Sequence, residues 1–311
     1  MGTPEFAVAS LDAVVNSKHE IVAVVTVPDK KAGRGKKLKY SAVKEYALEN
    51  NIKVLQPVKL KDSDFIQELE TFNADLFIVV AFRMLPRDVW AMPPMGTFNI
   101  HASLLPQYRG AAPINHAIIN DESKTGLTSF MIDDKIDTGR IILQHEVDIQ
   151  PEDNVGDLHD KLMELSRKTV IETLELIEKG KLELISQEDF IVDVNKLKPA
   201  PKIFKEDCHL KYNQKVEEAH LWVRGLSPYP AAFVLWQSPN GKEYLVKIYK
   251  SKVIKTESEV GKIYTDNKNY LALGFDGGQL EIIELQLQSK KRIDILDFLR
   301  GFDINNDWTW R

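Results

Sequence analysis

Two continuous apolar runs, Ile21–Val27 and Leu76–Phe82, constrain the fold of this chain more than any other feature. Strands that are apolar along their whole length lie in a parallel sheet whose two faces are both covered by helices. Helical patterns separate the runs, at Ser41–Asn50 and Asp62–Phe72, and Lys53–Leu55 is predicted to be a short strand. This alternation predicts an α/β domain with a Rossmann-like parallel sheet.

The same domain is predicted to continue through three more strands and a long helix. The strands are Thr97–His101, Leu127–Ile132 and Ile141–Val147, and the helix is Val155–Lys179, which would end at Gly180. A sheet of this kind usually begins with a strand that leads into the first glycine turn, whereas this sequence begins at the turn itself. The missing first strand suggests a truncated record or a late start codon.

A change of composition at residues 196–204 (KLKPAPKIF) predicts a second domain. Two prolines and three lysines in so short a run are typical of an exposed linker. We therefore expect a first domain at residues 1–190, a linker at 191–204 and a second domain at 205–311. In the second domain, a helix at Val216–Leu226 precedes short alternating runs and glycine turns, which predict a small antiparallel barrel of the oligonucleotide-binding (OB) type. The runs are Ala232–Trp236, Tyr244–Tyr249, Lys262–Tyr264, Tyr270–Leu273 and Leu280–Leu287.

Composition excludes several classes of protein. The single cysteine, Cys208, excludes an internal disulfide and a cysteine-built zinc site, and the seven histidines include no pair at metal-ligand spacing. No apolar stretch is long enough for a membrane span, and no signal-peptide pattern opens the sequence. A cytoplasmic protein without a metal is expected.

Charge is distributed unevenly along the chain. Residues 1–195 hold 22 Lys and Arg against 31 Asp and Glu, whereas residues 196–311 hold 19 against 15. A basic second half favours a polyanionic partner, although a solvated surface of mixed charge explains the difference equally well.

Asn99 and His101 are two residues apart on a predicted strand, so their side chains lie on the same face. In a parallel sheet, ligands bind beyond the carboxyl ends of the strands. An amide and an imidazole at that edge could stabilise a carbonyl oxygen as it becomes an oxyanion. Ordinary hydrogen bonding at a polar strand end is the alternative explanation.

Asp133, Asp134 and Asp137 follow a predicted strand in a turn that ends with Thr138-Gly139. Turn formation explains most aspartates in such positions. In the functional interpretation, one carboxylate faces His101 and orients it, and Asp137 is the best candidate.

The segment Asp29–Lys39 holds six basic residues and two glycines. Its spacing does not match a phosphate-binding P-loop. A cationic loop of this kind can contact a nucleic-acid backbone, although a solvated run of charge is the more common outcome.

Taken together, these segments resemble the methionyl-tRNA formyltransferase family over nearly the whole chain. The matching elements are a GTP-E-F turn at Gly2–Phe6, the PD-x-x-x-GRGKK loop at Pro28–Lys37, the N-x-H-x-SLLP-x-x-RGAAP signature at Asn99–Pro113, the aspartate of the DTG turn at Asp137, and a P-Y-P element at Pro228–Pro230. The signature is common to enzymes that use formyltetrahydrofolate, and the GRGKK loop indicates the tRNA branch.

The resemblance implies transfer of a formyl group from 10-formyltetrahydrofolate, the co-substrate, to the α-amino group of methionyl initiator tRNA, by a monomer. The implied catalytic residues are Asn99, His101 and Asp137; the implied folate-binding residues are Ser103, Leu104, Leu105 and Pro106; the implied tRNA-binding residues are Arg34, Lys36 and Lys37. Three alternatives stay open: a formyltransferase acting on the amine of a sugar nucleotide, a hydrolase of 10-formyltetrahydrofolate, and an RNA-binding protein whose folate site is vestigial.

Overall fold

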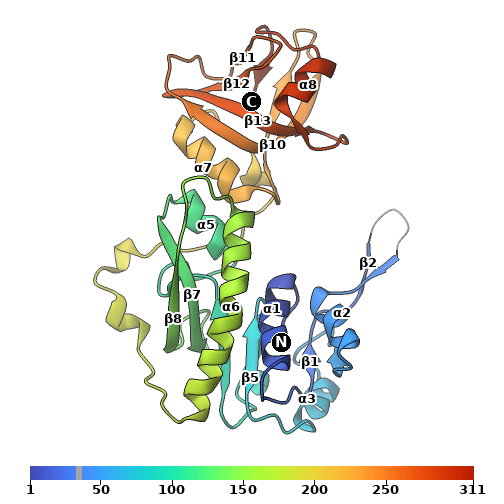
Figure 1. Cartoon of the computed structure of the whole chain (residues 1–311), viewed down its shortest axis with the longest axis vertical. Helices are drawn as coiled ribbons and strands as arrows, with labels where there is room; N and C mark the ends of the chain where they lie inside the picture. Colours follow the sequence, from blue (N-terminus) through green and yellow to red (C-terminus); the bar gives the residue numbers. More distant parts are fainter. Residues whose placement is uncertain (33–36) are drawn as a thin grey trace. The chain divides into compact units, whose positions relative to one another are not determined.

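The structure is a computed structural model that describes residues 1–32 and 37–311. The chain divides into two compact units (Figure 1). The first unit comprises Met1–Pro113, Lys124–Val147 and His159–Pro199, and the second comprises Ile114–Ser123, Asp148–Leu158 and Ala200–Arg311. Within the described ranges, no helix is long and apolar enough to cross a membrane.

The first unit contains the parallel strands that the apolar runs predict. Strand β5 (Phe77–Val80) pairs in parallel with β6 (Thr97–His101), and β1 (Val24–Val25) pairs in parallel with β4 (Val54–Leu55). The expected α/β domain is therefore confirmed. The sheet is mixed, however, because β7 (Lys124–Met131) runs antiparallel to β6 in the order β5-β6-β7-β8.

Among the remaining elements of the first half, those expected at Ser41–Asn50, Asp62–Phe72, Ile141–Val147 and Val155–Lys179 lie close to their predicted positions, and the sequence analysis gave no ranges for the others. The helices are α1 (Glu5–Val15), α2 (Ala42–Glu49), α3 (Ser63–Glu70), α4 (Arg87–Trp90), α5 (Pro113–Ile119) and α6 (Val155–Glu178), and the other strands are β2 (Lys30–Ala32), β3 (Lys37–Lys39) and β8 (Ile141–Asp148). Ser41 and Asp62 begin two of these helices, because each side chain accepts a hydrogen bond from a backbone N–H of the first turn.

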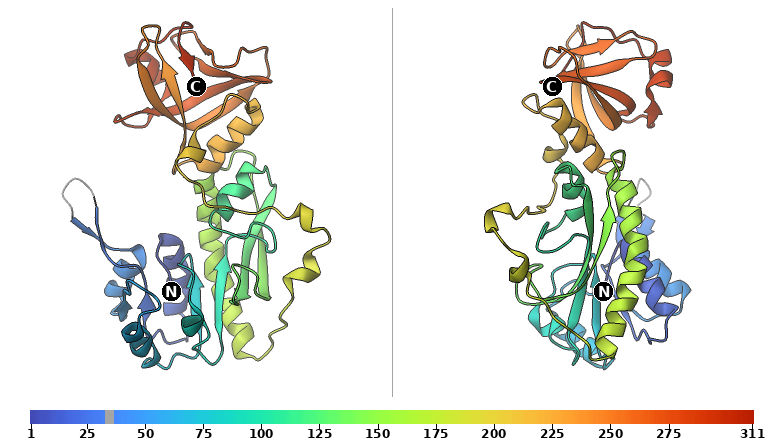
Figure 2. Two further views of the ribbon diagram at one scale, coloured as in Figure 1. Left: turned by 180° about the vertical axis from the view of Figure 1, so that it is seen from behind. Right: turned by 60° about the vertical axis from the view of Figure 1, so that its left-hand side comes forward.

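Helix α6 covers one face of the sheet, and the segment 181–199 runs along the other side (Figure 2). Thr173 of α6 donates to Ser129 Oγ of β7 at 2.8 Å, and Ser10 of α1 donates to Ser166 Oγ of α6 at 3.1 Å. These buried hydroxyl pairs fix the helices against the sheet and against each other.

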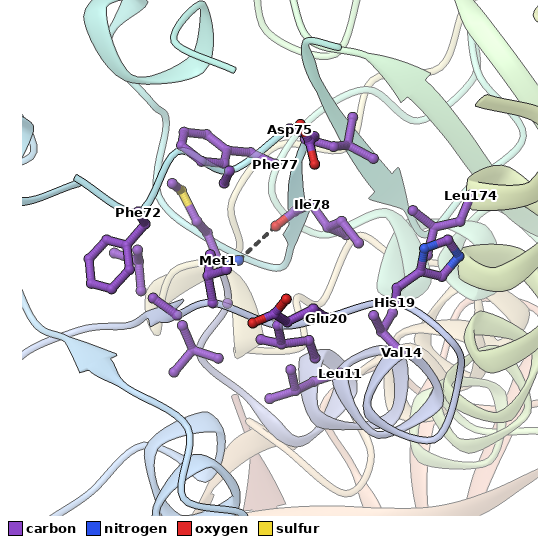
Figure 3. A pocket seen from close by; sticks show the side chains of 18 of the residues that line it. Met1, Leu11, Val14, His19, Glu20, Phe72, Asp75, Phe77, Ile78 and Leu174 are labelled. Atoms are coloured by element: carbon purple, nitrogen blue, oxygen red, sulfur yellow. Dashed lines mark hydrogen bonds between the residues drawn. The ribbon is translucent and has the colours of Figure 1, made fainter. Parts of the chain in front are cut away.

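Met1 and Gly2 lie between β1 and β5. Gly2 N–H donates to Val25 O at 3.0 Å, and Val80 N–H donates to Met1 O at 3.0 Å. The α-amino group of Met1 donates to Ile78 O at 2.7 Å, and burial lowers its pKa to about 5. A cavity of about 640 Å³ adjoins them and is lined by residues of β1, β5, α1 and the loop before β5 (Figure 3).

The second unit contains the predicted antiparallel barrel. Its strands run in the order β11-β12-β13-β10-β9-β15, and a bridge between Lys262 and Thr309 brings the two ends of this order together. The strands are β9 (Ala232–Gln237), β10 (Glu243–Ile254), β11 (Ile263–Thr265), β12 (Leu271–Phe275), β13 (Gly278–Leu287), β14 (Ile293–Asp294) and β15 (Thr309–Trp310). Trp236, Trp310 and Phe275 are completely buried in its core. The predicted antiparallel barrel is therefore confirmed, and it is nearly closed.

Two helices accompany the barrel. Helix α7 (Val216–Leu226) has the predicted bounds, and its Val216, Val223 and Leu226 join the barrel core. Helix α8 (Ile295–Gly301) contributes Phe298 to the same core and had no counterpart in the sequence analysis. The short strands β14 and β15 were missed as well, because a two-residue strand carries no periodic signal.

Candidate active site

Strands β5 and β6 end at the same edge of the sheet, because they run in parallel. His101 is the last residue of β6 and is 7% exposed, and Asn99 lies two residues earlier and is half-buried. The alternation of the strand places both side chains on one face. Ala81, which follows β5, has a φ of +48°, so the chain turns sharply as it leaves this edge.

Both ring nitrogens of His101 have a defined neighbour. Nε2 lies 2.8 Å from Tyr108 O, and since a carbonyl oxygen only accepts, Nε2 carries the hydrogen of this bond. Nδ1 lies 3.8 Å from Asp137 Oδ2, which is too long for a hydrogen bond. Nδ1 and the Asp137 carboxylate are therefore close neighbours that no direct hydrogen bond joins.

Asp137 differs from its two neighbours in the turn between β7 and β8. Its Oδ2 accepts a hydrogen bond from Gly110 N–H at 3.0 Å, and its backbone has a φ of +54°. Asp133 instead accepts from Lys135 N–H and from the Thr138 hydroxyl, as a turn-forming aspartate does. Asp134 is exposed. The structure thus brings Asp137 to His101 and assigns Asp133 to the turn.

The loop that holds Ser103, Leu104, Leu105 and Pro106 is organised by one buried hydroxyl. Thr128 of β7 is completely buried, and its Oγ1 donates to Ser103 O at 2.6 Å and accepts from Leu105 N–H at 3.0 Å. Gln144 of β8 donates to Leu105 O and to Thr128 Oγ1, both at 2.9 Å. The adjacent sheet therefore fixes the backbone of this loop.

Four residues of this region were not found from the sequence: Thr128, Gln144, Arg109 and Gln187. Arg109 donates to Gln187 Oε1 from Nε at 3.0 Å and from Nη2 at 2.6 Å. Burial lowers the pKa of the Arg109 guanidinium, and the nearby carboxylates of Asp137, Asp133 and Glu188 act against that shift. Arg109 lies within the N-x-H signature, which was the available signal, whereas Gln187 lies 78 residues further along the chain.

The basic loop is described only at its base. Arg34 and Lys36 lie outside the described residues, and β2 and β3, which flank them, pair antiparallel, with Lys37 opposite Ala32. Asp29 precedes the hairpin and bonds to Lys44 Nζ at 2.6 Å, which lowers the pKa of the Asp29 carboxyl.

The arrangement can act on a carbonyl group. The Asn99 amide can donate a hydrogen bond to an oxyanion, and His101 Nδ1 can accept a proton and then donate it to the oxyanion; the carboxylate beside the imidazole can also accept a proton. In the part of the chain that the structure describes, no three His, Cys, Asp or Glu side chains gather as a metal site would require.

Known proteins with this sequence pattern identify the family. The model of the formyl transferase family matches residues 1–174, and the model of the formyl transferase C-terminal domain matches residues 202–303. The methionyl-tRNA formyltransferase of Bacteroides fragilis is 50% identical over 306 residues, which cover 98% of this chain and 94% of the relative. The chain belongs to the methionyl-tRNA formyltransferases.

Two further proteins place the chain among its relatives. The methionyl-tRNA formyltransferase of Parabacteroides distasonis is 51% identical over 305 residues, which cover 97% of this chain and 94% of the relative. A solved N-formyltransferase from Helicobacter canadensis, in complex with folinic acid and dTDP-3-aminofucose, has a TM-score of 0.62 at 22% identity, over 90% of this chain and 96% of that one. The second likeness is one of fold.

Proposed function

We propose that this enzyme transfers the formyl group of 10-formyltetrahydrofolate to the α-amino group of methionyl initiator tRNA. The observation that carries the proposal is the 50% identity to a methionyl-tRNA formyltransferase over 98% of the chain. The site supports it, because Asn99, His101 and Asp137 gather where the parallel strands end, which is where ligands bind in α/β folds.

Asn99 and His101 stabilise the oxyanion in the proposed mechanism. The α-amino group of the methionyl ester has an ordinary pKa near 8, so a useful fraction is neutral at physiological pH and can attack the formyl carbon. The new C–N bond converts the formyl oxygen into an oxyanion, which accepts a hydrogen bond from the Asn99 amide and a second from His101 Nδ1 once that nitrogen has taken the proton of the amine. Each such donor typically contributes about 3 kcal/mol to the stability of the transition state.

Asp137 orients His101 and handles the proton. The attacking amine loses a proton, and the bond between the formyl carbon and N10 of the folate breaks. Asp137 Oδ2 and His101 Nδ1 lie 3.8 Å apart, so in this mechanism they take the proton from the amine and return it to the departing N10. Tetrahydrofolate and formylmethionyl-tRNA are the products.

We assign the remaining roles as follows. Residues 1–190 form the catalytic domain, 191–204 the linker and 205–311 the tRNA-binding barrel. Ser103 to Pro106 line the folate site, and the basic loop with Arg34, Lys36 and Lys37 contacts the acceptor end of the tRNA. The enzyme works as a cytoplasmic monomer.

Formyl transfer to methionyl initiator tRNA tests the proposal, with wild type beside an Arg34→Ala/Lys36→Ala variant. We expect efficient transfer by wild type and a raised KM for the tRNA in the variant, because phosphate contacts from two cations are lost. A Lys135→Ala variant, which loses one positive charge at an exposed lysine outside the basic loop, is the control for a change of surface charge elsewhere.

The alternatives predict different results in the same assay. Transfer only to an amino-sugar nucleotide, or formate release with water as acceptor, would replace the tRNA assignment. Tight tRNA binding without any turnover would support an RNA-binding protein instead.

A further inference from the structure

Gln187 is a buried amide that uses its full hydrogen-bonding capacity within the proposed site. It is 2% exposed and begins the short 3-10 helix Gln187–Phe190, after α6. Its Oε1 accepts both hydrogen bonds from Arg109, and its Nε2 donates to Asp137 O at 3.0 Å and to Gly139 O at 2.8 Å. One side chain therefore joins two loops that approach from different parts of the chain.

The two loops are the ones that place Asp137 beside His101. Their direct link is the hydrogen bond from Gly110 N–H to Asp137 Oδ2. Gln187 adds a second link, through the backbone carbonyl of Asp137. With the side chain held from Gly110 and the carbonyl held from Gln187, Asp137 has little freedom to rotate.

The backbone of Asp137 needs such support. Its φ of +54° lies in the left-handed region, which is strained for a residue with a Cβ and persists only where the surrounding structure holds it. Gly139 is equally constrained, because a Cβ at that position would meet Met131 O at 1.6 Å. Gln187 bonds to the carbonyls of both residues and so holds the turn at its two constrained positions.

The chemistry of the site favours glutamine over glutamate at this position. A carboxylate could accept from Arg109, but it could not donate to the two carbonyls and would repel their oxygens. It would also add a negative charge to a region that already contains Asp133, Asp137 and Glu188 around Arg109. A neutral side chain with one acceptor and two donor hydrogens fits all four partners.

We propose that Gln187 is a positioning residue for formyl transfer, which sets the separation of Asp137 from His101 by holding the β7–β8 turn against the Arg109 loop. The inference rests on the proposed function for its catalytic consequence. Its structural consequence, the position of the Asp137 carboxylate, can be measured without turnover.

The test compares Gln187→Met and Gln187→Glu with Asp189→Asn, an exposed control in the same 3-10 helix. We expect both Gln187 variants to lower kcat roughly 10- to 100-fold, since a displacement of about 1 Å at a reacting group can cost that much. The KM values for folate and tRNA should change by less than about three-fold, because neither substrate contact is removed. In an Asp137→Asn background, Gln187→Met should cost little more, because residues that act through one another are not additive.

The pH dependence of kcat distinguishes a positioning role of Gln187 from a general effect on the stability of the protein. The carboxyl group introduced in Gln187→Glu can donate one hydrogen bond once it is protonated, so kcat relative to wild type should rise as the pH falls. The charged groups around it are Arg109, Asp133, Asp137 and Glu188. A constant ratio, additive effects with Asp137→Asn, or raised KM values at unchanged kcat would overturn the inference.

Crystal structures of Gln187→Met and wild type separate this inference from the proposed function. We expect Asp137 to leave the left-handed region and its carboxylate to move away from His101 Nδ1. An unchanged Asp137 would overturn the positioning role even if turnover fell. Absence of formyl transfer by folded wild type would instead overturn the proposed function and leave the structural result to decide the role of Gln187.

Discussion

At the scale of single residues, the candidate site depends on three side chains with distinct environments. His101 is buried and bonded to Tyr108 O, Asp137 is bonded to Gly110 N–H, and Asn99 is half-buried on the same strand face as His101. Hydrogen bonds to the backbone thus hold His101 and Asp137 in place before any substrate binds. Such preorganisation is what makes hydrogen-bond donors effective in catalysis, since they need not reorient during the reaction.

Asn99→Ala should lower kcat by about 10²- to 10³-fold, because one donor to the oxyanion is lost. The affinity for 10-formyltetrahydrofolate should change little, since the donor acts mainly when charge develops on the formyl oxygen. Steady-state kinetics and a fluorescence titration with the folate measure the two effects. Asp134→Asn, at an exposed aspartate of the turn, is the control; normal turnover in Asn99→Ala would remove Asn99 from the mechanism.

At the scale of elements, β7 supports both faces of the sheet through neighbouring hydroxyls. Thr128 bonds to the backbone of the Ser103–Pro106 loop, and the next residue, Ser129, accepts a hydrogen bond from Thr173 of α6. The alternation of a strand sends these side chains to opposite faces. One strand therefore links the candidate folate loop to the long helix.

Thr128→Val should weaken folate binding and destabilise the protein together. The substitution preserves shape but leaves the buried Ser103 carbonyl and Leu105 N–H without their partner, which costs about 1–3 kcal/mol per group. Ser129→Ala is a matched control on the other face of β7, and it should lower stability while leaving the folate Kd unchanged. Equal effects of both variants on the Kd would show that the Thr128 contacts do not shape the folate site.

At the scale of the whole molecule, each unit has its own core and its own predicted task. Strand β15 closes the barrel. The backbone N–H of Trp310 donates to Gly261 O at 2.8 Å, and the centroids of the Trp310 and Phe275 rings lie 4.5 Å apart. Trp310 is the penultimate residue and is completely buried. The integrity of the barrel therefore depends on residues at the very end of the sequence.

Trp310→Ala should destabilise the barrel by about 3–5 kcal/mol, the usual cost of removing a buried tryptophan side chain. Phe204→Ala, at a side chain that is 55% exposed, should change stability by less than about 0.5 kcal/mol. Denaturant unfolding followed by circular dichroism measures the free energy of unfolding of both variants. If the barrel binds tRNA, Trp310→Ala also raises the KM for methionyl-tRNA; an unchanged KM in a variant with an unfolded barrel would contradict that role.

The sequence alone determined the local structure and the chemistry of the family signature. Apolar runs predicted β1 and β5, and helical periodicity with a terminal glycine predicted α6 to within one residue of its observed end. These properties follow from patterns of a few residues, because the strand and helix repeats act over short distances along the chain. The signature residues likewise lie within a single segment, Asn99–Pro113, which a linear reading finds easily.

Only the tertiary structure decided how distant segments meet. Such contacts include the antiparallel pairing of β7 and the closure of the barrel by β15. They also place Asp137, and not Asp133, beside His101, and they bring Gln187 to the backbone of Asp137. The hydrogen bond from Gln187 to Asp137 joins residues 50 positions apart. No short repeat encodes such a pair, since its partners are brought together by the packing of the strands and helices between them and not by their own propensities.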